Sequence, residues 1–180
     1  MTSGWAACQA GDTTRGLALL QKGKRGWEAT GAKFSTTRNA TQLAEGYILA
    51  GMPEVAFEHL ATARSHGASF GELYTAAEVC PVMAMALQAG QGPVSEVEAQ
   101  FNEALETSHR QQARLFELRA AVGLARLWSN QGRTAEAIHL LAPLYEWFTE
   151  GFALPDLIEA GALLADLGIR SASDPSFQPT

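Results

Sequence analysis

Four histidines are the first residues in this chain that could do chemistry: His59, His66, His109 and His139. His59 and His66 are seven residues apart, so on a helix they share one face. A zinc site needs three or four converging ligands. No cysteine or second acidic residue stands at ligand spacing, so we expect solvated or capping histidines, and neither a metal site nor a cofactor.

Nucleophilic catalysis requires a nucleophile, a base and an orienting group in contact. Cys8 and Cys80 both lie in apolar stretches, where a buried thiol stays protonated and inert. Paired carboxylates such as Asp156 and Glu159 fall in the first turn of a predicted helix, where the helix dipole explains them. We therefore expect that the chain is not an enzyme.

Composition limits the partners and the compartment. Of 180 residues, 47% are hydrophobic and 18% charged, which indicates a globular protein. The net charge of -6 argues against broad binding to nucleic acid or anionic membranes. Two cysteines indicate a reducing compartment. No apolar run is long enough to span a membrane and no secretory signal is evident, so we expect a cytoplasmic protein.

The elements that must position these side chains recur along the chain. Gly11, Gly51, Gly92 and Gly132 are spaced by about 40 residues, and each sits in a short turn. Residues 5, 9 and 12 positions after each glycine match one face of a helix. The residue five positions after each glycine is small, the residue nine positions after it is large, and the residue twelve positions after it is mostly small. Residues seven and eight positions before each glycine, such as Met85 and Ala84 in the third unit, belong to a preceding helix.

Each unit is therefore a helix, a glycine turn and a second helix. Pro81 inside the fifth helix predicts a kink or a late start there. No segment alternates with period two, so no strands are expected. We predict one repeat domain over 1–169 and a disordered tail over 170–180. The predicted helices are 2–10, 13–29, 37–50, 53–66, 72–88, 95–110, 114–130, 134–149 and 155–167.

The glycine column and its flanking small residues resemble the tetratricopeptide repeat. Small residues before the turn at Ala44 and Ala125, and aromatic residues at Tyr47 and Trp128, fit that pattern. The resemblance implies an all-α, right-handed superhelix of antiparallel helix pairs. We expect about four repeats and a C-terminal capping helix, because stacking buries the apolar face of each unit.

A narrower resemblance covers nearly the whole chain. The stretches ELRAAVGLARLW, QGRTAEAIHLLAPLYEWFTEGF and PDLIEAGALLADL resemble the tetratricopeptide-like C-terminal region of bacterial class III adenylate/guanylate cyclase–ATPase regulators. The chain departs from that family between Val79 and Met83. No phosphate-binding loop occurs, since Gly23-Lys24 lacks the earlier glycine and is followed by Arg25. The resemblance implies a non-catalytic signalling tail and a protein–protein interaction scaffold.

The tetratricopeptide resemblance also implies a binding groove. In such arrays, residues 13, 10 and 6 positions before the turn point into the concave face. Arginines there could hold carboxylates, which suggests an acidic or C-terminal peptide as ligand. The alternative is that they pair with the chain's own Glu45, Glu72 or Glu117. A small-molecule sensor is the second function considered. The candidate groove residues are Arg38, Thr41, Glu45, Arg119, Val122 and Arg126.

The two ends of the array could also contact partners. The basic cluster from Arg15 to Arg25 is a solvated face or a contact with an acidic neighbour. The aromatic residues of the last full repeat and the turn after it form a core or a docking patch; they are Trp128, Tyr145, Trp147, Phe148 and Phe152. Dimerisation through exposed end helices, such as the first helix around Trp5, also remains open.

Overall fold

The computed structural model describes residues 1–32, 35–70 and 76–169, and within these ranges it contains helices and no strands. The predicted tail at 170–180 lies outside this part of the chain. None of the helices in the described ranges is long and apolar enough to cross a bilayer. The helices are α1 (Thr2–Gln9), α2 (Thr13–Ala29), α3 (Thr36–Leu49), α4 (Pro53–Phe70), α5 (Ala76–Ala89), α6 (Val94–Arg110), α7 (Arg114–Asn130), α8 (Thr134–Glu146) and α9 (Pro155–Asp166).

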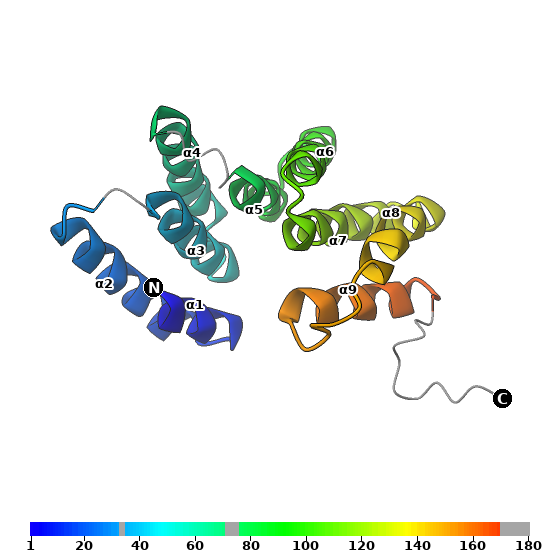
Figure 1. The fold of residues 1–180 in the computed structure, drawn as a ribbon, viewed down its shortest axis with the longest axis horizontal. Helices are drawn as coiled ribbons and strands as arrows, with labels where there is room; N and C mark the ends of the chain where they lie inside the picture. The colour runs from blue at the N-terminus through cyan, green and yellow to red at the C-terminus, as the bar shows by residue number, and fades with distance from the viewer. Residues whose placement is uncertain (33–34, 71–75, 170–180) are drawn as a thin grey trace.

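The helices alternate between two roles along a curved array (Figure 1). The odd-numbered helices are here called A helices. Each A helix from α1 to α7 packs on the next helix in sequence, called a B helix. Each A helix also packs on the next A helix, from α1 through α9. Stacking of this kind gives a row of local cores instead of one centre.

The core residues follow that row. Leu20 and Leu43 belong to the first core cluster, Leu60 and Val82 to the second, and Phe101 to the third; all are almost fully buried. The last cluster joins α7, α8 and α9. The large residue nine positions after each of the four predicted turn glycines, Leu20, Leu60, Phe101 or Leu141, is completely buried, as the repeat predicted.

Three turns use glycine because the backbone takes a positive φ, which costs glycine little. Gly11, Gly51 and Gly132 have φ of 90°, 73° and 77°. The third turn differs from the prediction: Gln91, with φ of 56°, takes the left-handed position, and Gly92 follows it. The backbone bonds show this equivalence, since Met52 N donates to Tyr47 O and Gly92 N donates to Leu87 O, both at 2.9 Å.

This one-residue offset changes which third-unit residues are equivalent to those of the other units. Counted from Gln91, the small residue seven positions before the turn is Ala84, which is fully buried. Met85, which the Gly92 column placed there, lies six positions before the turn and is partly exposed. Glycine at position 92 avoids a close contact, because a Cβ there would lie 2.8 Å from Leu87 Cγ and 3.0 Å from the backbone oxygen of Leu87.

Candidate functional site

A pocket of about 290 Å³ lies between the A helices, with walls from α1, α3, α5, α7 and α9. The helices that line it form the inner row of the curved array (Figure 1). Four A helices each contribute the residue six positions before their turn. These residues are Trp5, Glu45, Met85 and Arg126. The pocket is thus the place where equivalent positions of successive repeats converge.

The centre of this pocket is an ion-pair network around Arg119. Its Nη1 donates to Glu45 Oε1 at 2.9 Å and its Nε donates to Asp156 Oδ1 at 2.7 Å. Trp5 Nε1 donates to the other oxygen of Glu45. The side chains of Arg119, Glu45 and Asp156 are only 20%, 10% and 16% exposed. Helices α1, α3, α7 and α9 are therefore joined by one chain of polar contacts.

Burial sets the electrostatics of this network. Burial raises the pKa of Glu45, and the opposing effects of Arg119 and the Trp5 hydrogen bond do not cancel it. Burial likewise raises the pKa of Glu78, against the attraction of Arg38 and Arg119. For Arg119, burial opposes the charge, but the hydrogen bond from Arg119 to Asp156 and the nearby Glu45 outweigh it, so its pKa is raised. Arg119 stays charged, while Glu45 and Glu78 hold protons more tightly than exposed carboxyls.

A second ion pair lines the same pocket. Arg126 Nη1 lies 2.7 Å from Glu159 Oε1, and both side chains are about half exposed. Exposed pairs of this kind contribute at most about 1 kcal/mol, because water and salt screen them. Leu49, an exposed apolar residue, and Ile48 from α3 provide an apolar wall beside it.

The predicted groove residues fall into two groups. Glu45, Arg119 and Arg126 line the pocket, and Arg38 is exposed on α3, close enough to Glu78 to oppose the burial that raises the pKa of Glu78. The residues ten positions before the turn, Thr41 and Val122, do not reach the groove.

Their burial explains why they miss it. Thr41 is 1% exposed and donates from Oγ1 to Thr37 O at 2.9 Å, and Val122 is 4% exposed. Val122 belongs to the core shared by α7, α8 and α9, and neither residue lines the pocket, so the structure does not place these two residues in the groove as expected.

The pocket residues that sequence reasoning missed include Trp5, Met85, Asp156 and Glu159. Trp5 stands six positions before Gly11, so the repeat offset itself points to it. Met85 has the same offset once Gln91 replaces Gly92 in the count. Asp156 and Glu159 had no such signal, because they enter from α9, which carried no assigned groove position.

The alternative that the arginines bind the chain's own carboxylates holds for the Arg119–Glu45 pair. Glu117 is engaged elsewhere: its Oε2 lies 2.7 Å from Arg114 Nη1 and its Oε1 lies 2.9 Å from His109 Nδ1. Glu72 lies outside the described residues.

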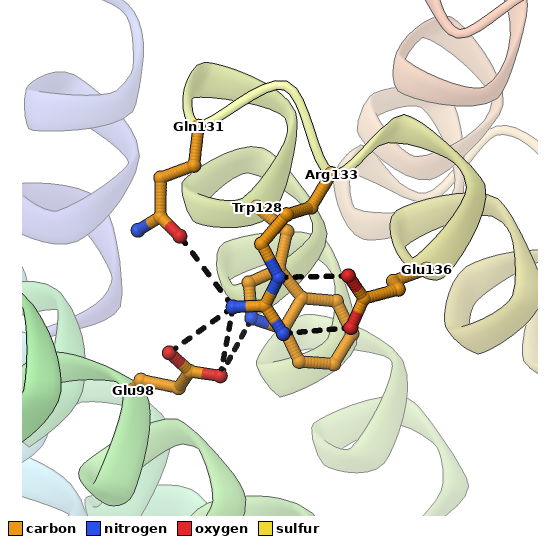
Figure 2. A network of polar contacts seen from close by, with 5 residues as sticks. All are labelled: Glu98, Trp128, Gln131, Arg133 and Glu136. Atoms are coloured by element: carbon orange, nitrogen blue, oxygen red, sulfur yellow. Dashed lines mark hydrogen bonds and ion pairs between the residues drawn. The ribbon is translucent and has the colours of Figure 1, made fainter.

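A second arginine network lies at the turn between α7 and α8 (Figure 2). The Arg133 guanidinium bonds Glu136 at 2.9 and 2.7 Å and Glu98 at 3.1 and 3.3 Å. It stacks 4.6 Å from the centre of the Trp128 ring, and Trp128 Nε1 donates to Glu98 at 2.8 Å. The hydrogen bond to Glu136 is the main cause that raises the pKa of Arg133, and it lowers the pKa of Glu136.

The environments of the two cysteines and of the candidate metal ligands differ from those of the two arginine networks. Burial raises the pKa of both Cys8 and Cys80, which keeps the thiols protonated. Across the described ranges, histidine, cysteine and acidic side chains do not gather in a group that could hold a metal ion. The concave pocket can instead bind apolar groups and pair with charged ones.

Comparison with known proteins identifies the fold. No family model and no curated protein matches the chain. Crystal structures of kinesin light chain-like, nearly identical TPR-like repeats from Podosopora anserina, in original form and as a single-residue variant, match with a TM-score of 0.63. They are 20% and 19% identical, and each match covers 92% of this chain and 82% of the other. The fold is therefore an all-α, tetratricopeptide-like right-handed superhelix, and the similarity to cyclase–ATPase regulators rests on the sequence motifs alone.

Proposed function

We propose that this chain is a non-catalytic protein–protein interaction scaffold whose concave groove binds a short peptide of a partner. The observation that supports this most is the pocket between the A helices, where one residue from each of four successive repeats converges. Its walls combine apolar side chains, Trp5, Leu49 and Met85, with charged ones. This mixture suits a peptide that inserts one apolar side chain into the pocket and carries a charged group next to it.

The arginines differ in how readily they could meet a peptide carboxylate. Arg119 already holds two largely buried carboxylates, so an exchange there would leave Glu45 and Asp156 without their cation. Arg126 is half exposed and pairs only with exposed Glu159, and exposed Arg38 has no ion pair among the described residues. We therefore assign recognition of an acidic or C-terminal peptide to Arg38 and Arg126, and positioning to Arg119.

A titration with fluorescent peptides tests this. The probes are peptides that carry one large apolar residue and end either in a free carboxylate or in an amide. The double variant Arg38→Ala/Arg126→Ala should weaken binding of the carboxylate peptide at least tenfold. The matched control is Arg64→Ala, an exposed arginine paired with Glu103 between α4 and α6, which should change binding less than twofold. Unchanged affinity in the double variant would contradict binding of the peptide in the groove.

A small-molecule sensor is the second candidate. The pocket of about 290 Å³ is close to the lower end of the size range for small-ligand sites, and it holds the partly buried Glu45 and Arg119. A metabolite that binds there should raise the melting temperature of the chain, and the rise should grow with the logarithm of its concentration above the Kd. A screen in which peptides but no metabolites raise the melting temperature would favour the scaffold.

We also propose that the chain is a cytoplasmic regulatory tail of a bacterial cyclase–ATPase signalling protein, or a free-standing relative. The support is the set of motifs from Glu117 to Leu167. Sequencing the gene upstream of Met1 tests it: a cyclase or ATPase domain in the same reading frame is expected. A different class of upstream domain would contradict the proposal.

A further inference from the structure

The C-terminal end of the array exposes an apolar patch, here called the end face, formed by Trp147, Phe152, Leu154 and Ile158. Among the described residues, eight large apolar side chains are exposed, and these four lie within twelve positions of one another. Trp147 and Leu154 share a surface concavity of about 780 Å³. Clustering of this kind marks a surface that binds something, whereas scattered apolar residues do not.

The repeat geometry shows what shape fits the end face. The turn after α9 repeats the earlier ones, because Gly168 has φ of 92° and Ile169 N donates to Leu164 O at 2.9 Å. In the turn after α7, Gly132 and Arg133 make the equivalent arrangement, with Arg133 N donating to Trp128 O at 2.9 Å. Helices α7 and α9 can therefore be compared position by position.

The comparison shows that α9 exposes its stacking positions. Fourteen and ten residues before the turn, α7 has Leu118 and Val122, which are 0% and 4% exposed in the core shared with α8 and α9. At the same distances stand Leu154, which directly precedes α9, and Ile158 in α9, which are 45% and 58% exposed. The end face thus presents the surface on which, everywhere else in the array, another helix lies.

The charges of the residues around the end face indicate which kind of helix would bind there. Residues 134–169 contain six carboxylates and no lysine or arginine. Three of them pair with arginines of α7 or of the turn that follows it. The other three, Glu146, Glu150 and Asp166, are exposed and have no ion pair with another described residue. Glu150 lines the same concavity as Trp147 and Leu154, and Glu146 directly precedes Trp147.

We propose that the end face binds a cationic amphipathic helix of a partner protein, which stacks on α9 as α9 stacks on α7. Apolar residues of that helix cover Leu154, Ile158 and Trp147, and its lysines or arginines face Glu146, Glu150 and Asp166. The exposed alanines Ala162 and Ala165, farther along α9, permit close approach of a second helix. This surface is distinct from the concave groove, so it does not depend on the peptide function proposed above.

The test uses the full chain and two designed 18-residue helices with the same leucine and alanine face. One helix carries lysines on its polar face and the other carries glutamates. The lysine helix should bind the wild-type chain at least tenfold more tightly in a fluorescence anisotropy titration. Ile158→Glu should weaken that binding at least tenfold, whereas Val94→Glu, at an equally exposed apolar site on α6, should not. Glu150→Gln/Asp166→Asn should reduce both the affinity and its dependence on salt.

Three results would overturn the proposal. The first is equal binding of both helices, or binding unaffected by Ile158→Glu. The second is self-association of the chain in sedimentation experiments that Ile158→Glu abolishes, since the occupant would then be a second copy. The third is binding of the lysine helix only after residues 170–180 are removed, which would make that segment the occupant.

Discussion

Arg119 and Arg133 each hold two carboxylates, but they connect different parts of the molecule. Arg119 reaches Glu45, 74 residues away, and Asp156, 37 residues away. Arg133 reaches Glu98, 35 residues away, and Glu136, three residues away (Figure 2). The Arg119 side chain is 20% exposed and that of Arg133 is 32% exposed.

The difference teaches what each network stabilises. The ion pair from Arg119 to Glu45 joins α7 to α3. Helix α5 packs between these two helices (Figure 1). This ion pair links residues two repeats apart, so it constrains how α3, α5 and α7 are placed relative to one another. The Arg133 network joins α6 to the start of α8 and fixes a single turn.

The largest expected effect follows from removing the concave centre. Arg119→Ala leaves Glu45 and Asp156 largely buried without their cation, and should lower the free energy of unfolding by about 2–4 kcal/mol. Urea denaturation measures this. The matched control is Arg126→Ala in the same pocket, whose exposed pair should cost less than about 1 kcal/mol. Equal losses in the two variants would contradict the special role of Arg119.

A smaller loss of stability is expected at the turn. Arg133→Ala removes hydrogen bonds and the stacking on Trp128, but its carboxylate partners can turn to water. The loss in urea denaturation should be less than half of that for Arg119→Ala. Arg133→Lys should not restore it, because lysine lacks the planar fork that bonds Glu98 and Glu136 together. Full recovery by lysine would show that charge alone matters at this turn.

The two networks should also respond to pH with opposite sign. The pKa of Glu45 is raised in the fold, so its contribution to stability is full below its ordinary value of 4.5 and falls as pH rises above it. The pKa of Glu136 is lowered, so its contribution is present above 4.5 and is lost as pH falls below.

Unfolding measured between pH 3.5 and 7.5 checks this. The stability of the wild type relative to Glu45→Gln should decrease as pH rises above 4.5. Its stability relative to Glu136→Gln should decrease as pH falls below 4.5. The same sign in both comparisons would show that burial does not dominate at Glu45.

The sequence predicts the repeat well because its strongest signals are local. The buried residue nine positions after each of the four repeat glycines and the positive φ of three of those glycines follow from a 40-residue period and from simple steric rules. The third turn was misassigned because Gly92 looked like the turn residue, whereas close contact with Leu87 is what requires glycine there. A glycine in a sequence does not show which of these two constraints it meets.

The groove was predicted only in part for a physical reason. The offset of six residues found Glu45 and Arg126, since it depends only on position within one repeat. Asp156, which pairs with Arg119 from α9, depends on how far the array curves, and curvature is a sum of small rotations between helices. No single repeat encodes that sum, so the Arg119 network became visible only in three dimensions.

The smallest expected effect concerns salt, and it separates the networks most directly. Screening acts on charges that water reaches, with a Debye length of about 10 Å at 0.1 M and about 3 Å at 1 M salt. The stability lost in Arg133→Ala should therefore shrink between 0.05 and 1 M NaCl, because Glu136 is exposed. The loss in Arg119→Ala should stay nearly constant, because Glu45 and Asp156 are shielded by α1 and α9. If both losses shrink in parallel, water reaches the concave centre, and the curvature of the array does not depend on Arg119.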